Sequence, residues 1–206
     1  MILATPFIPE ITDFTDYASA IRKKGKLLNH VHLVISRPED EEAAYEFGEK
    51  MSDLFLKSHT AIIAADQRNG NQLAVDLFRA ATKFCHEYVH GEGELAEPAM
   101  LYMDPSYRPL ENGWLDRIQS AYYLKRAPLV FGRFTKEEQK ILIGPVVLNK
   151  AFHKSSGLLP FVPPNTHYRT YMQHEFRQNA VETFLIGPGS QDSVLRQQKP
   201  KKPAAA

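Results

Sequence analysis

The sequence has a single cysteine, Cys85, and a formal net charge of only +1 from 25 basic and 24 acidic residues. One cysteine excludes an internal disulfide framework and fits a reducing compartment. The balanced charge leaves no polyanion-binding footprint, so we expect no specific nucleic-acid partner. No apolar run approaches the roughly 20 residues that a membrane-spanning helix needs, so we expect no membrane partner and a cytoplasmic location.

Several loop signatures of common enzymes are missing as well. The sequence has no Gly-x-x-x-x-Gly-Lys, no Gly-x-Gly-x-x-Gly and no Gly-x-Ser-x-Gly. It therefore lacks the phosphate loops of ordinary ATPases and dinucleotide-binding folds, and the nucleophile elbow of hydrolases. A chain of 206 residues with 43% hydrophobic and 24% charged residues suits one globular domain with a real core.

Strand-like and helix-like patterns alternate along the chain. Apolar runs predict strands at residues 2–5, 31–35, 60–65, 99–103, 129–132 and 141–148. Helical spacing predicts helices at 16–28, 73–89 and 168–185, one from Trp114, and one from Ser36 with the apolar face Ala43, Phe47, Met51 and Leu54. This order predicts an α/β domain with a mostly parallel mixed sheet and helices on both faces. His30 and His32 flank a strand start, and we expect them to face solvent.

The composition changes after residue 187. Gly187-Pro188-Gly189-Ser190 interrupts the pattern, and residues 197–206 contain only Gln, Lys, Pro and Ala. We expect one domain over residues 1–187 and a low-complexity, basic Pro/Lys/Ala tail over 188–206 that cannot order itself. Two interpretations of the tail stay open: a solvated end, or an arm that binds a protein partner in an assembly. Both predict that removing residues 190–206 leaves the domain folded.

The most informative stretch runs from Ala99 to Asp116. An apolar run up to Met103 ends abruptly in Asp104 and Pro105. This predicts a carboxylate at the carboxyl end of a central strand, facing a cleft, where α/β sheets bind their ligands. Trp114 opens the next helical pattern, and for this residue we favour packing in the core over stacking on a sugar.

The residues from Leu101 to Asp116 resemble the small phage-encoded glycosyltransferase-like proteins of the GT-A fold, where this strand end reads like Leu-Tyr-Leu-Glu-Pro-Asp-x-x-Pro-Leu-x-x-Gly-Trp-Leu-Asp. The resemblance continues in order and spacing through residues 5–7, 76–81, 144–148 and 168–186. It implies a GT-A-like fold that binds a nucleotide-sugar or another small molecule and transfers the sugar to an unknown acceptor. It also implies that Thr5 and Phe7 contact the nucleoside, and that Asp104 and Ser106 hold the diphosphate with a divalent metal, Mn or Mg, on Asp104.

The sequence departs from this family at two positions. Ser106 stands where the family has a second acid, and a hydroxyl is a poor substitute for a carboxylate ligand of a hard cation. The family's aspartate before the C-terminal helix is also absent, which leaves Glu175 or His167 as the base for the acceptor. Two functions therefore stay open: an active glycosyltransferase, and a catalytically inactive GT-A-like structural or binding component of a phage virion or assembly. The second would be found in the virion or the host cytoplasm.

A third function follows from a separate motif. His86-Glu87-Tyr88-Val89-His90 matches His-Glu-x-x-His, which on a helix places two imidazoles on one face beside a glutamate that can activate water. The next ligand position of metzincins holds Ala96 instead of histidine, so a third zinc ligand would have to come from His153, His167 or His174. We keep a zinc metallopeptidase as a remote alternative and predict that no third ligand converges on this pair.

Overall fold

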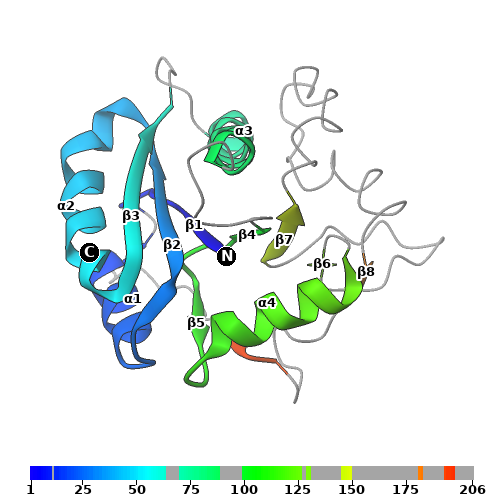
Figure 1. Cartoon of the computed structure of the whole chain (residues 1–206). Coiled ribbons are helices and arrows are strands. Elements are labelled where there is room, and N and C mark those ends of the chain that lie inside the picture. The colour runs from blue at the N-terminus through cyan, green and yellow to red at the C-terminus, as the bar shows by residue number, and fades with distance from the viewer. Residues whose placement is uncertain are drawn as a thin grey trace.

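The computed structural model describes residues 1–10, 12–63, 70–88, 99–126, 129–130, 145–149, 181–182 and 193–197. In this part of the chain a seven-stranded sheet has the order β3-β2-β1-β4-β7-β6-β8, and β5 pairs with β9 in a separate ribbon (Figure 1). The strands are β1 (Ile2–Pro6), β2 (Leu27–Ser36), β3 (Phe55–Ile62), β4 (Ala99–Tyr102), β5 (Tyr107–Pro109), β6 (Leu129–Val130), β7 (Val146–Asn149), β8 (Val181–Glu182) and β9 (Leu195–Gln197). The helices are α1 (Phe14–Arg22), α2 (Glu41–Met51), α3 (Gly70–Tyr88) and α4 (Trp114–Lys125), with short 3₁₀ turns η1 (Pro38–Asp40) and η2 (Ser52–Leu54).

Strands β3, β2, β1 and β4 are parallel neighbours. Strand β7 runs antiparallel to β4, and β6 is antiparallel to β7 but parallel to β8. The predicted α/β class with a mostly parallel mixed sheet is therefore confirmed. Because the four parallel strands point the same way, their carboxyl ends meet at one edge of the sheet, where ligand sites of such sheets form.

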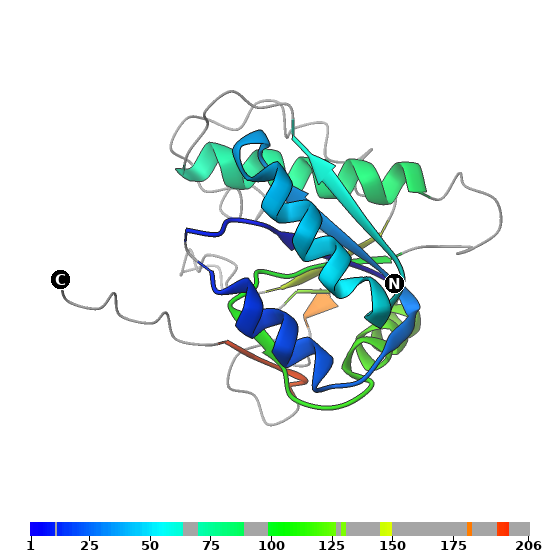
Figure 2. The same ribbon diagram turned by 90° about the vertical axis from the view of Figure 1, so that its left-hand side faces the viewer.

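Helices cover both faces of this sheet. Side chains of α1, α2 and α4 pack in one apolar cluster, and those of α3 pack in a second cluster on the opposite face. Figure 2 shows α1 and α2 side by side in front of the sheet, with α3 crossing behind the upper end of α2. Trp114 at the start of α4 is fully buried in the first cluster, as predicted. None of the described helices has the length and apolarity to cross a membrane.

Some predicted boundaries were wrong. Helix α1 ends at Arg22, and β2 already begins at Leu27, because Gly25 adopts a left-handed φ of 89° between them. Ala44 rather than Ala43 is buried on α2. Strand β3 begins at Phe55, five residues before the predicted start. A strand at Val181–Glu182 contradicts the helix predicted over 168–185 at these two positions, and the rest of that range lies outside the described residues.

The two histidines of β2 were also misplaced by the prediction. His30 and His32 are 1% and 0% exposed, not solvated. Strand β2 is an inner strand of the sheet, between β1 and β3. Helices pack on both faces of this sheet, so side chains on either face of β2 are buried. His30 meets Asp116 of α4, with 2.9 Å between Nε2 and Oδ1, and His32 stacks on Phe55 with ring centroids 4.9 Å apart.

Five residues that we expected in the tail belong to the folded domain. Strand β9 pairs antiparallel with β5, so that Arg108 lies opposite Arg196. The N–H of Leu110 donates to the carbonyl of Val194 at 2.8 Å. Val194 and Leu195 are fully buried in the same cluster as α1 and α4. Residues 190–206 are therefore not a uniformly dispensable tail, although the exact boundary near residue 187 stays a prediction.

Candidate functional site

The carboxyl ends of β1 and β4 lie next to each other. Ala4 pairs with Tyr102 in the parallel ladder, and the N–H of Met103 donates to the carbonyl of Ala4 at 3.0 Å. Thr5 follows Ala4 at the end of β1, and Asp104 follows Met103 after β4, so the two polar residues stand at neighbouring strand ends. As predicted, Asp104 follows a central strand of the sheet.

Asp104 begins a tight turn that leads into β5. Its Oδ1 accepts the N–H of Ser106 at 2.8 Å, and its carbonyl accepts the N–H of Tyr107 at 3.0 Å. Proline in the second position presets the backbone for such a turn, and an aspartate in the first position stabilises it. Asp104 and Ser106 are both partly exposed, whereas Met103 before them is buried. The turn thus presents one carboxylate and one hydroxyl at the strand end.

Thr5 has a different environment. Its side chain is fully buried, and Oγ1 lies 3.3 Å from the Tyr17 hydroxyl and 3.3 Å from Nε2 of His32. Nδ1 of His32 continues the chain to Oγ of Ser58 at 3.3 Å. Burial lowers the pKa of His32 to about 3 and raises the pKa of Tyr17 above its usual range. Thr5 is therefore part of a neutral, interior polar chain.

Phe7 is also internal. Its ring stacks on Phe14 with centroids 4.1 Å apart and lies 5.6 Å from Phe47. These three rings form the floor of a groove of about 460 Å³ between α1 and α2. Asp104 and Ser106 do not line this groove. Sequence reasoning gave no sign of the groove, because it depends on how two helices pack. The nucleoside contacts assigned to Thr5 and Phe7 stay predictions.

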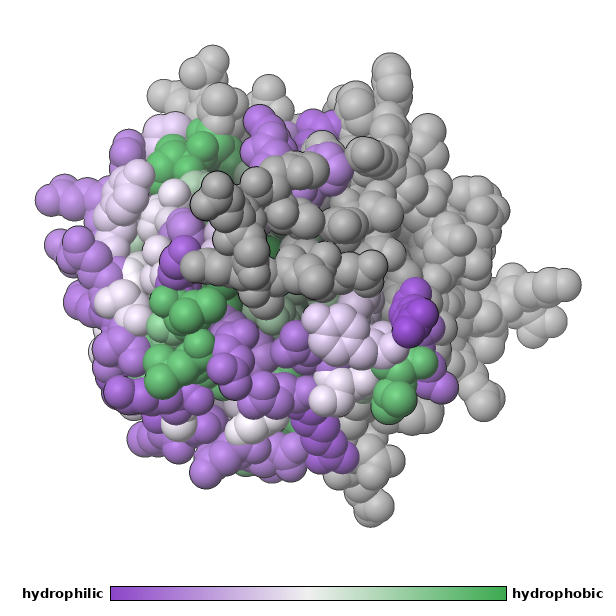
Figure 3. Space-filling view, in the orientation of Figure 1, coloured by the Kyte–Doolittle hydropathy of each residue, from purple (hydrophilic) through white to green (hydrophobic). Residues whose placement is uncertain are grey.

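The outer rim of this groove is polar. Arg22 on the rim already donates to both carboxylate oxygens of Asp53, at 2.6 and 2.9 Å, and to the carbonyl of Lys50 at 2.8 Å. The coloured part of the face in Figure 3 is mainly hydrophilic, with hydrophobic side chains in small separate patches. We therefore place the candidate site at the Asp104 turn, where the topology of the sheet supports a ligand site.

The described donors do not make a resident metal site. Among the residues that the structure places, no three His, Cys, Asp or Glu side chains come close enough to share a metal ion. The Asp104 turn supplies a single carboxylate, and one oxygen of it is already hydrogen-bonded to Ser106. Mg²⁺ needs about six oxygen ligands in near-ideal geometry. These residues alone do not fit a divalent cation.

Three other predicted site residues are not placed. Glu175 and His167, the candidates for the acceptor base, lie outside the described residues, and so does His90 of the His-Glu-x-x-His motif. His86 and Glu87 lie in the last turns of α3. The roles assigned to Glu175 and His167 stay predictions.

Two residues beside the turn were missed by sequence reasoning. Arg108 of β5 donates to the Asp16 carboxylate of α1 at 2.8 Å, although 92 residues separate them. No local sequence pattern predicts this ion pair, since it joins a strand and a helix from distant parts of the chain. The one available hint was a basic residue four positions after the acid at the strand end.

Neither a protein-family model nor a curated protein sequence matches this chain. Several solved structures are similar to it in fold. Mouse xyloside xylosyltransferase 1 has a TM-score of 0.50 at 11% identity, covering 89% of this chain and 84% of that one. The glycosyltransferase GlyE of Streptococcus pneumoniae TIGR4 has a TM-score of 0.56 at 8% identity, covering 89% and 45%. S. aureus TarS 1–349 has a TM-score of 0.55 at 9% identity, covering 96% and 60%.

The chain spans only 45% and 60% of the two bacterial proteins. At these identities the likeness shows the fold alone, and the fold is that of GT-A-type glycosyltransferases. The GT-A-like architecture expected from the sequence is therefore confirmed, whereas substrate and activity are not shown by it.

Proposed function

We propose that this chain binds a nucleotide-sugar at the Asp104 turn and transfers the sugar to an acceptor. One observation carries the proposal: a partly exposed carboxylate lies at the carboxyl end of a central parallel strand, in a fold shared with glycosyltransferases. This is the edge where open α/β sheets bind ligands. The groove between α1 and α2 is lined mainly by residues of these two helices, with Phe7 as its one lining residue at the end of a strand.

The residues of the turn suit the polar parts of such a donor. A carboxylate accepts hydrogen bonds from ribose or sugar hydroxyls, and a serine hydroxyl donates to a phosphate oxygen. A cation that arrives with the diphosphate is the partner that a lone Asp104 would need, since the described residues do not hold one by themselves. Glu175 and His167 remain our candidates for deprotonating the acceptor hydroxyl.

A second function is favoured by the composition of the same turn. Ser106 in place of a second acid, and the engagement of one Asp104 oxygen by the Ser106 N–H, reduce what the turn offers to a metal diphosphate. A GT-A-like component that binds its ligand without turnover fits this reduction. Its place in a phage virion or assembly, with a protein partner bound through the C-terminal tail, remains part of that hypothesis.

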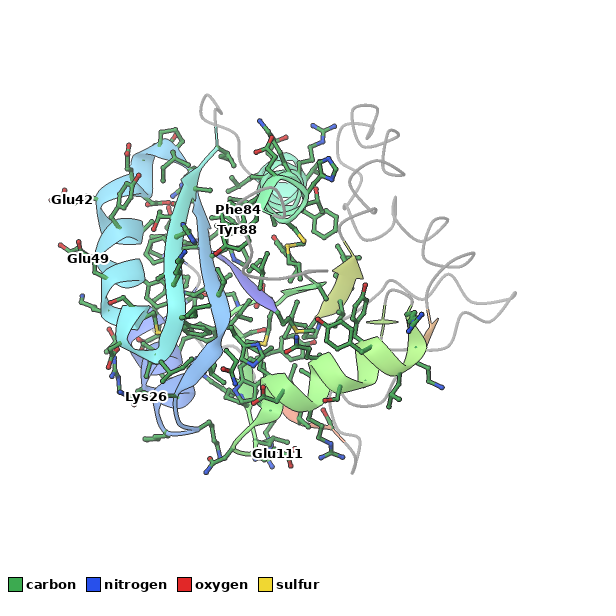
Figure 4. The ribbon with its side chains drawn as sticks, viewed as in Figure 1. Lys26, Glu42, Glu49, Phe84, Tyr88 and Glu111 are labelled. Carbon is green, nitrogen blue, oxygen red and sulfur yellow. The ribbon has the colours of Figure 1, made fainter. Side chains whose placement is uncertain are left out.

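Calorimetry with UDP, GDP, ADP and CDP, each with and without Mn²⁺, tests the proposal. We expect one of the four to bind, and Asp104→Asn to weaken that binding at least tenfold. Glu42→Gln is the matched control, because Glu42 points away from the sheet on the outer face of α2 (Figure 4) and is exposed.

Release of nucleoside diphosphate from the matching nucleotide-sugar then separates the two functions. Binding with release indicates a transferase, and binding without release indicates the inactive component. Failure of all four nucleotides to bind, in either metal condition, would contradict both.

A further inference from the structure

Arg108 fastens the Asp104 turn from its inner side. The residue is 8% exposed. Its Nη1 donates to the carbonyl of Pro105, and also to the carbonyl of Tyr107 at 3.1 Å. Both carbonyls belong to the turn that carries Asp104 and Ser106. Arg108 therefore binds the backbone of the turn rather than one of its side chains.

The other side of the same guanidinium is anchored on α1. Nη2 and Nε both donate to Oδ2 of Asp16, at 2.8 and 3.3 Å. Asp16 lies in the first turn of α1, where its N–H donates to the Asp13 N-cap carboxylate at 3.0 Å. The guanidinium also lies over the ring of Tyr17, 5.2 Å from its centroid. Arg108 thus joins the turn to a capped, rigid helix end.

The contact with Pro105 fixes the orientation of one peptide group. The peptide bond between Pro105 and Ser106 is trans, as are all those of the described residues, so the carbonyl of Pro105 and the N–H of Ser106 point in opposite directions. Arg108 holds the carbonyl end of this peptide, and Asp104 Oδ1 holds the N–H end. The negative end of the peptide dipole is thereby turned toward α1, away from the side on which Asp104 lies.

The chemistry of arginine suits this role. A planar guanidinium has five N–H donors in a fixed fork, so it can bind a carboxylate and two carbonyls at once. A lysine carries the same charge but only one nitrogen. The backbone of Arg108 is itself held in the β5–β9 ribbon, opposite Arg196. The side chain therefore connects three separately anchored pieces: the ribbon, the turn and α1.

We infer that Arg108, held by Asp16, is a positioning residue that sets the Asp104–Ser106 turn in the orientation that meets the donor's diphosphate. The ligand in this inference rests on the proposed function, whereas the fastening of the turn does not. A purely structural arginine would stabilise the fold without controlling the turn. A positioning arginine controls the N–H of Ser106 and, through it, the affinity for the nucleotide.

Hydrogen exchange of the Ser106 amide, in the full chain, is the readout that a merely structural role would not move. The reference is the amide of Met103, which is bonded to Ala4 in the β1–β4 ladder. We expect Arg108→Met and Arg108→Lys to reduce the protection of Ser106 at least tenfold, with Met103 unchanged. Arg22→Met is the matched control, since it breaks the other arginine–aspartate pair of α1, with Asp53. It should leave Ser106 at the wild-type level.

The same variants are then titrated with the nucleoside diphosphate that the wild type binds. Both Arg108 variants should lose at least tenfold in affinity, and Arg22→Met should lose none. Wild-type Ser106 protection, or wild-type affinity, in Arg108→Met would overturn the inference.

The inference can still be tested if the wild type binds no nucleotide or if Arg108→Met does not fold. If the wild type binds no nucleotide, the proposed function fails, and Ser106 exchange alone decides whether Arg108 fastens the turn. If Arg108→Met does not fold, Asp16→Asn takes its place, because it weakens the anchor without removing the guanidinium. Loss of Ser106 protection in that variant supports the role, and full retention contradicts it.

Discussion

The carboxyl ends of β1 and β4 are neighbours at one edge of the sheet, yet they use their polar residues in opposite ways. At the end of β1, Thr5 is buried beneath α1 and α2 and bonded to Tyr17 and His32. At the end of β4, Asp104 remains partly exposed in a turn that Arg108 holds from within. Position at the ligand-binding edge is therefore not sufficient for a site. The helices that cover each strand end decide whether its polar groups are buried in the core or left accessible to a ligand.

Removal of β9 should have the largest effect on this arrangement. A chain ending before Ser193 loses Val194 and Leu195 from the core and the partner strand of β5. Two fully buried aliphatic side chains are worth roughly 3–6 kcal/mol together. We expect thermal unfolding to shift down by about 10 °C or more. A chain ending after Gln197 is the control and should unfold like the full chain. Equal stability of both truncations would contradict the assignment of β9 to the domain.

The buried polar chain at the end of β1 should make the stability of the protein depend on pH, through His32 beside Thr5. An unfolded histidine has a pKa of about 6.5, whereas burial lowers the pKa of folded His32 to about 3. Below pH 6.5 His32 becomes protonated in the unfolded chain but stays neutral in the folded one. The free energy of unfolding therefore falls as the pH falls toward 3. At pH 5 the loss relative to pH 8 is roughly 2 kcal/mol.

Urea unfolding at both pH values measures this loss, and His32→Gln should remove that part of it. Burial lowers the pKa of His30 as well, so His30 contributes a decrease of the same sign in both proteins. The difference between the two proteins isolates His32. Identical pH dependence in wild type and variant would show that His32 is protonated normally in the folded state.

Ser106→Asp sharpens the contrast at the end of β4. A second carboxylate beside Asp104 supplies the ligand that a divalent cation lacks there. We expect Mn²⁺-dependent binding of nucleoside diphosphate to increase roughly tenfold, which corresponds to about 1.4 kcal/mol. Stability should change by less than about 0.5 kcal/mol, since Ser106 is partly exposed. Ser106→Asn, similar in size but uncharged, should show no increase. Equal calorimetric affinities for the two variants would indicate that the missing acid is not what limits metal binding.

Tyr17→Phe should have the smallest effect and should act on one strand end only. It removes the hydroxyl beside Thr5 but keeps the ring beneath the Arg108 guanidinium. Loss of one buried hydrogen bond costs about 1 kcal/mol. Nucleotide affinity should be unchanged. Tyr45→Phe, on the exposed surface of α2, provides the baseline for stability. Reduced nucleotide affinity in Tyr17→Phe would mean that the two strand ends are coupled, against the separation described above.

Local sequence signals were sufficient for the strand end that carries Asp104. The apolar run of β4, the Asp-Pro pair and the helical spacing from Trp114 are all contained within a short segment, and each was correctly predicted. The alternation of elements likewise predicted the mostly parallel sheet. These features depend on neighbours in sequence, which the residues themselves reveal.

The failures share a different cause. Thr5 at the end of β1 and His32 within β2 have polar side chains, and only the packing of α1 and α2 shows that they are interior. Arg108 and Asp16 lie 92 residues apart. Val194 and Leu195 form too short an apolar run to signal a strand beside a low-complexity segment, and their burial depends on β5. In each case a tertiary contact decides the role of the residue.

The central claim is that the donor's diphosphate binds at the end of β4 and not along the outer part of the groove between α1 and α2. Backbone amide spectra recorded while a nucleoside diphosphate and Mg²⁺ are added locate the ligand directly. The account predicts the largest shifts at the amides of Ser106 and Tyr107, with those of Ser19, Arg22 and Lys50 along the α1–α2 groove unchanged. Largest shifts along the groove, or no shifts at the turn under saturating nucleotide, would contradict it.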